Sequence, residues 1–120
     1  MSSVIEMLAA NSDLTAAQFE TLLLQKRVIR GEMTVKNAAA SRRPVPVAVG
    51  TYHRVLDQAR TRVKQGVITV LLSTSLGLID VEELKKLLDL LGRNQVNEGA
   101  ERMDELIQLI NEIVARIVVV

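Results

Sequence analysis

Apolar residues recur along most of this chain at the three- and four-residue spacing that places them on one face of an α-helix. No pair of alternating apolar and polar segments joined by a hairpin turn occurs. The pattern therefore predicts an all-α fold. In the longest predicted helix, beginning near Val49 or Gly50, one apolar face is formed by Tyr52, Val55, Leu56, Ala59 and Val63.

Short polar signals predict where the first helices begin and end. Ser3 with Glu6, and Thr15 with Gln18, have the spacing of capping boxes, in which the two side chains satisfy free backbone amides at a helix start. The first predicts a short helix to about residue 10. The second predicts a helix that ends near Gly31, since glycine tolerates the left-handed conformation that closes many helices.

Further signals divide the middle of the chain. Thr34 can cap a short helix through residues 38–40, and Pro44 and Pro46 terminate it. For residues 67–72 we favour continuation of the long helix across Gly66, because no partner strand is visible. A buried strand is the alternative, on account of the β-branched residues.

The last third of the chain predicts two more helices. One opens at Asp80 and closes at Gly92, and residues 93–99 form a polar loop. Its inward face contains Val81, Leu84, Leu87, Leu88 and Leu91.

The final helix has an apolar stripe broader than a coiled-coil seam. Such a face needs a cover, and we expect a second copy of the chain to supply it, which predicts a homodimer. The alternative is that the helix completes the core of its own protomer. The residues predicted to mediate dimerisation are Met103, Leu106, Ile107, Ile110, Ile113, Val114 and Ile117.

Composition narrows the chemistry. The chain has 120 residues, 2% aromatic residues and no cysteine, which excludes disulfides, thiolate zinc sites and a cysteine nucleophile. The single histidine, His53, leaves no pair of imidazoles for a metal. No glycine-rich phosphate loop or paired catalytic carboxylates occur. We therefore expect no enzymatic activity, no cofactor and no metal.

No segment predicts a membrane protein. The N-terminus lacks the features of a signal peptide, and the most apolar run, residues 66–79, is shorter than the ~20 residues of a spanning helix. We expect a cytoplasmic protein without a membrane partner.

The charge distribution is uneven although the net charge is only +1. Residues 26–64 contain ten basic and two acidic residues, a balance of +8, whereas residues 1–25 carry −3 and residues 65–120 carry −4. A concentrated basic segment in a nearly neutral chain favours a surface for a polyanion such as nucleic acid. The alternative is a solvated basic face without a partner.

The segment 34–64 has the pattern of a helix-turn-helix: a short alanine-rich helix, a turn with prolines, and a longer helix. It resembles the helix-turn-helix of sigma-factor region four and of LuxR-type domains over residues 14–64. The turn, residues 41–48, is longer here, and the chain after residue 65 has no counterpart in those families. The matching residues are Leu14-Thr15-Ala16-Ala17-Gln18, Gly50-Thr51-Tyr52, Leu56 and Ala59-Arg60.

This resemblance implies duplex DNA as the partner, with the longer helix in the major groove. Residues near the start of that helix and off its apolar face are candidates for reading base edges: Thr51, His53, Arg54 and Gln58. Candidates for contacts with phosphates are Lys36, Arg42, Arg43, Arg60, Arg62 and Lys64. For each, the alternative is a solvated helix residue, and Thr51 can also cap the helix.

The sequence thus predicts a DNA-binding region at 1–64 and a helical dimerisation region at 65–120, joined in one compact unit. We expect a sequence-specific, homodimeric regulator of transcription. The alternative is a helical adaptor or chromatin-type protein whose basic face binds an acidic partner, or DNA without specificity. An RNA or single-strand binder is disfavoured by the scarcity of aromatic side chains, on which such proteins stack bases.

Overall fold

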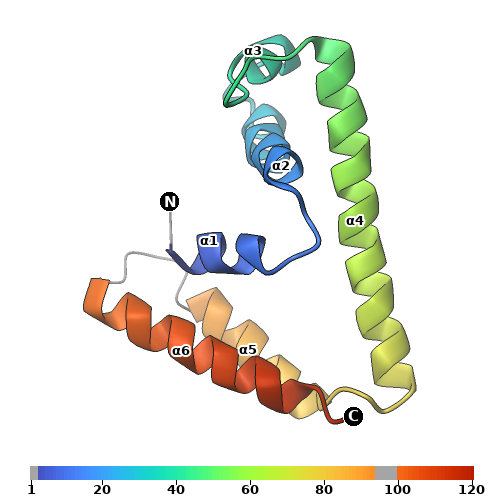
Figure 1. Cartoon of the computed structure of the whole chain (residues 1–120), viewed down its shortest axis with the longest axis vertical. Coiled ribbons are helices and arrows are strands. Elements are labelled where there is room, and N and C mark those ends of the chain that lie inside the picture. The colour runs from blue at the N-terminus through green and yellow to red at the C-terminus, as the bar shows by residue number, and fades with distance from the viewer. Residues whose placement is uncertain (1–2, 94–99) are drawn as a thin grey trace. The chain divides into compact units, whose positions relative to one another are not determined.

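A computed structural model of the chain describes residues 3–93 and 100–120. Within these residues the fold is all-α, as predicted (Figure 1). The only β-type pairing among them is an isolated bridge between Ile79 and Val118. The helices are α1 (Ser3–Ala10), α2 (Ala16–Ile29), α3 (Val35–Ala40), α4 (Val49–Ser75), α5 (Val81–Arg93) and α6 (Ala100–Ile117).

The predicted caps of α2 and α3 are confirmed. The Thr15 hydroxyl accepts a hydrogen bond from the Gln18 backbone amide, and the Gln18 side chain accepts one from the Thr15 amide, each at 3.1 Å. At the other end of α2, Gly31 adopts a φ of +77°, as a left-handed helix stop requires. Thr34 caps α3 by accepting from the Asn37 amide at 3.1 Å. These boundaries are therefore set by local residues.

The long helix α4 continues through Gly66 to Ser75, so the strand alternative for residues 67–72 is wrong. It ends where Gly77, at a φ of +72°, reverses the chain. The amides of Gly77 and Leu78 there donate to the carbonyls of Thr74 and Ser73.

The next helix, α5, opens as predicted, with the Asp80 carboxylate accepting from the Glu83 amide at 3.2 Å. It extends through Gly92 to Arg93 instead of closing at Gly92. The rest of the predicted polar loop, residues 94–99, lies outside the described residues.

The chain divides into two compact units. We call residues 9–66 the basic unit, since its ten basic and four acidic residues give a charge of +6. Residues 1–8 and 67–120 form the acidic unit, with five basic and ten acidic residues and a charge of −5. The units divide after residue 66, and residues 1–8 belong with the C-terminal part of the chain.

The core of the basic unit joins α2, α3 and the first half of α4. The small side chains of Ala38 and Ala39 are fully buried, which allows α3 to approach Tyr52 and Leu56 of α4 closely. The Tyr52 hydroxyl donates to the side-chain oxygen of Gln25 in α2 at 2.9 Å. Packing and this hydrogen bond together fix the rotation of α4 about its axis, and with it the direction of its opposite face.

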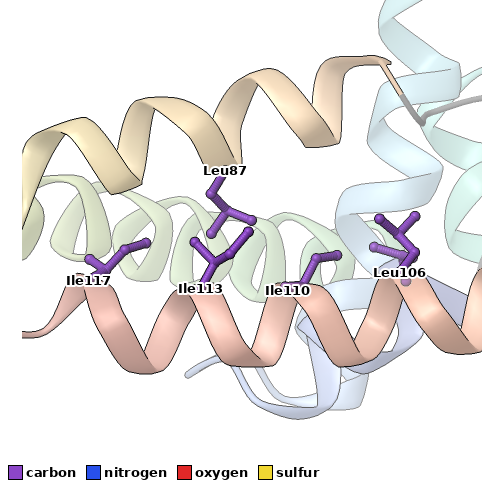
Figure 2. Close-up of a cluster of buried hydrophobic side chains, with 6 residues drawn as sticks. Leu87, Leu106, Ile110, Ile113 and Ile117 are labelled. Atoms are coloured by element: carbon purple, nitrogen blue, oxygen red, sulfur yellow. The ribbon is translucent and has the colours of Figure 1, made fainter.

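The core of the acidic unit is aliphatic and lies between α5 and α6. Figure 2 shows Leu87 of α5 directed toward a row of side chains along one side of α6. Val4 of α1 belongs to the same cluster, which explains why residues 1–8 join this unit. The row on α6 consists of Leu106, Ile110, Ile113 and Ile117.

This core includes the stripe predicted to hold a second copy of the chain. Leu106, Ile110, Ile113 and Ile117 are buried against α5 and α1 of their own protomer, and Met103 and Ile107 pack against them. Of the seven predicted dimerisation residues, Val114 alone is exposed. The alternative interpretation, in which α6 completes the core of its own protomer, therefore describes this face. Helix periodicity identifies the apolar stripe, but it does not show which element covers it.

Candidate nucleic-acid interface

The first half of α4 has one buried and one exposed side. Tyr52, Leu56 and Ala59 are buried as predicted, and Val55 is half-buried. Val63 continues the same spacing but is 47% exposed, so its predicted place in the core is wrong. The contact of α4 with the core of the basic unit ends at Ala59, and every residue from 60 to 72 is exposed.

An open groove of about 710 Å³ runs along the exposed side of α4 and reaches the start of α2. Its α4 residues follow the spacing of one helix face, opposite the buried face of Tyr52, Leu56 and Ala59. The groove is polar because its lining contains guanidinium, amide, hydroxyl and carboxylate groups. The lining residues are Gln18, Arg54, Asp57, Gln58, Thr61, Arg62 and Gln65.

The groove collects three of the residues predicted to contact DNA. Arg54 and Gln58, predicted to read bases, lie one helical turn apart, and Arg62, predicted to contact phosphate, lies one turn further. Among the described residues, neither Arg54 nor Arg62 forms an ion pair with a carboxylate. Both guanidinium groups can therefore offer their donors to a ligand.

Two of the predicted base-reading residues lie outside this groove. His53 is exposed beside it, and its ring makes an edge contact with Tyr52 at a centroid distance of 6.1 Å. Thr51 is half-buried within the first turn of α4, two residues past the helix start, so it does not occupy the capping position. The structure thus separates Arg54 and Gln58 from His53 and Thr51.

The predicted phosphate contacts also differ from one another. Lys36 on α3 and Lys64 on α4 are exposed. Arg60 is exposed as well, but its guanidinium lies 3.5 Å from the Asp57 carboxylate in an i,i+3 pair. Such surface pairs contribute little to stability, so a phosphate can compete for Arg60.

Arg42 is a correction to the predicted interface, because its side chain is 8% exposed. One terminal nitrogen donates to the Thr21 hydroxyl at 3.0 Å, and its Nε has no hydrogen-bond partner among the described residues. The neighbouring Arg43 is exposed, and its backbone amide donates to Glu20 at 2.8 Å. Only Arg43 of this pair is on the surface, a difference that their identical side chains cannot indicate.

Four lining residues were not predicted as site residues: Gln18, Asp57, Thr61 and Gln65. A sequence signal existed for three of them, since Asp57, Thr61 and Gln65 continue the spacing of Arg54 and Gln58 along the helix. Gln18 could not be found in this way, because its position beside α4 depends on how α2 packs.

Metal-binding groups and membrane-spanning helices were sought in the described part of the chain. No group of three or more metal-binding side chains occurs among the described residues. No helix in that part is long and apolar enough to cross a membrane.

Burial raises the pKa of the Tyr52 hydroxyl, against smaller opposing effects of the Arg60 and Arg42 charges, so the phenol stays protonated at neutral pH.

Similarity to known proteins gives no function for the groove. No protein-family model, curated protein or solved structure matches the chain.

Proposed function

We propose that the protein binds duplex DNA through the groove of its basic unit, as a sequence-specific homodimer that regulates transcription. The observation that carries this proposal is the row of Arg54, Gln58 and Arg62 along the exposed face of α4. A helix anchored on one face by Tyr52, Leu56 and Ala59 presents the other face in a fixed direction, as recognition in a major groove requires.

The side chains in the row suit base edges and phosphates. An arginine can donate two hydrogen bonds to guanine, and a glutamine can pair with adenine, so Arg54 and Gln58 are assigned to bases. Asp57, in the same groove, can accept from the amino group of cytosine. Arg62 lies two turns beyond Arg54 and is assigned to a phosphate.

The separation of charge supports the same proposal. Phosphates attract the basic unit, at +6, and repel the acidic unit, at −5. Opposite charges on two units favour encounters in which the basic unit meets the DNA first. The adaptor hypothesis uses the same attraction, and the experiment below separates the two.

The proposal is tested by titrating labelled duplex DNA with the wild-type chain and with Arg54→Glu/Arg62→Glu. We expect the double variant to lose most of its duplex affinity. We also expect its salt dependence to fall by ~0.9 log units per log unit of salt for each lost phosphate contact. The matched control is Lys85→Glu/Lys86→Glu, which makes the same charge change on two exposed lysines of α5. Equal losses in both variants contradict a groove-specific contact.

Parallel titrations with single-stranded DNA, RNA and an acidic polypeptide distinguish the partner class. We expect the duplex to bind most tightly. Equal or tighter binding of the polypeptide replaces the proposal with the adaptor function, and a preference for RNA or single strands overturns the duplex assignment.

Sequence specificity is tested by selecting binding sites from random duplexes. Arg54→Ala should flatten the preference at one base pair, because a base-edge contact carries ~1–3 kcal/mol of discrimination. His53→Ala is the comparison, since His53 is exposed but lies outside the groove. An unchanged preference with Arg54→Ala contradicts the assigned base contact.

A further inference from the structure

The second half of α4 carries exposed apolar side chains. Val67, Ile68, Leu71 and Leu72 are each more than half exposed. Val67 and Leu71 lie one turn apart, as do Ile68 and Leu72, so the four side chains form one patch. We call these four residues the α4 patch.

The α4 patch lies in a stretch without charge. No ionisable residue occurs from position 65 to position 79. Exposed helix faces of soluble proteins normally carry charged residues, and a large apolar patch marks a contact with another molecule. The small polar residues Thr69 and Ser73 lie on the other side of the helix, so the patch has a defined direction.

We propose that a second copy of this chain covers the α4 patch, with the two α4 helices antiparallel and crossing near Leu71. A two-fold axis brings the same surface of both copies together, so the surface must be compatible with itself. An uncharged, apolar patch meets that requirement, because it brings no charge against its own copy and hides apolar side chains on both sides. The stripe on α6 is already buried in its own protomer and cannot serve this purpose.

Charge complementarity favours the antiparallel direction. The part of α4 before the patch is basic and the first turn of α5 after it is acidic. A parallel pair places each basic position beside its own copy, whereas an antiparallel pair directs it toward the acidic turn of the partner. The basic positions on the patch side of α4 are Arg60 and Lys64, and the acidic ones are Asp80, which caps α5, and Glu82 and Glu83 in its first turn.

This inference rests on the proposed function only for its purpose, since two copies of a DNA-binding unit read two half-sites. The first test is made without DNA, by light scattering on the eluting full-length chain. We expect wild type at twice the chain mass of 13.2 kDa, and Leu71→Lys at 13.2 kDa. Leu71 is 61% exposed, so this change leaves the folded protomer intact, which circular dichroism checks.

The matched control is Thr69→Lys, which adds the same charge two residues before Leu71, on the opposite side of α4. We expect it to remain a dimer. A monomeric wild type, or a dimer that survives Leu71→Lys, overturns the inference. Dissociation of both variants alike shows an effect of charge alone, and it overturns the location.

The direction is tested with single cysteines, because the chain has none of its own. Under mild oxidation, Leu71→Cys should form a disulfide dimer, since its two copies meet at the crossing. Val67→Cys chains should cross-link faster with Ser75→Cys chains than either does with itself. Preferential self-linkage of Val67→Cys and of Ser75→Cys indicates a parallel pair and overturns the antiparallel arrangement.

Failure of this inference and failure of the proposed function give different results. A chain that dimerises through the α4 patch but does not bind duplex DNA contradicts only the function. A chain that binds duplex DNA as a monomer contradicts the inference and the homodimer, and it leaves the proposed duplex-binding groove standing.

Discussion

The two units of this chain differ in the kind of side chain that they bury. In the acidic unit the described buried residues are all aliphatic, and they pack between α5, α6 and α1. In the basic unit, three of the described buried side chains are polar or charged: Gln18, Thr21 and Arg42. The described core of the first unit is therefore purely apolar, whereas the second buries polar groups whose hydrogen bonds must be satisfied.

This difference teaches how a short chain can divide its tasks. Aliphatic burial contributes ~1.5–3 kcal/mol for each large side chain without requiring any particular partner. Buried polar groups contribute less on balance, but they fix the direction of the helices that carry them. The basic unit, whose exposed helix face carries the proposed interface, has the more specific interior.

The largest expected effect tests the aliphatic core. Ile110 is 1% exposed, so Ile110→Ala should lower the free energy of unfolding by about 2–5 kcal/mol, from lost burial and the cavity left behind. The exposed Val114, one turn further along α6, supplies the control Val114→Ala, expected within about 0.5 kcal/mol. Urea unfolding measures both. Similar values for the two changes contradict the packing described for α6.

The second prediction compares two neighbouring arginines of the basic unit. Arg42 is buried without an ion pair to any described carboxylate, so its charge is poorly compensated. Replacing it by an apolar side chain of similar length, Arg42→Met, should leave the free energy of unfolding unchanged or raise it by up to about 2 kcal/mol. The duplex affinity should be unchanged.

Arg43→Met is the matched change at the surface, and it should weaken duplex binding to all sequences while leaving stability within about 0.5 kcal/mol. Urea unfolding and duplex titration of both variants decide the comparison. Loss of stability with Arg42→Met shows that the hydrogen bond to Thr21 outweighs the cost of the buried charge.

The smallest effect concerns the buried phenol of Tyr52. Tyr52→Phe removes its hydrogen bond to Gln25 and should cost about 0.5–1.5 kcal/mol near neutral pH. Because burial raises the pKa of Tyr52, the unfolded chain loses this proton first as the pH rises above ~10. Wild type therefore loses stability there in a way that the variant does not, and the difference between them shrinks.

Urea unfolding of both proteins from pH 7 to pH 11 measures this difference. A constant difference over the whole range contradicts the environment described for Tyr52.

Local features of the fold were predictable from the sequence, because neighbouring residues determine them. The capping box of Thr15 and Gln18, the cap at Thr34 and the stop at Gly31 each need only a few adjacent residues. The buried face of α4 was equally predictable, since Tyr52 and Leu56 follow helical spacing.

Features that depend on distant parts of the chain were not predictable in this way. The stripe on α6 was correctly identified as apolar, but periodicity could not show that Leu87 and Val4 cover it. Val63 continues an apolar face yet lies beyond the last buried position of α4. For the interface, the row from Arg54 through Gln58 followed from helix geometry, whereas the burial of Arg42 depended on the packing of residues 41–48 against α2.

Gly66 lowers the local stability of the backbone hydrogen bonds of α4. It lies at the boundary between the two units and inside the helix, where glycine costs ~0.5–1 kcal/mol relative to alanine. A Cβ at this position would meet no atom within 4 Å, so packing does not require the glycine. The amide protons around residue 66 should therefore exchange with solvent faster than those near Leu56. The sequence thus favours local opening of α4 around Gly66, in the second half of the helix.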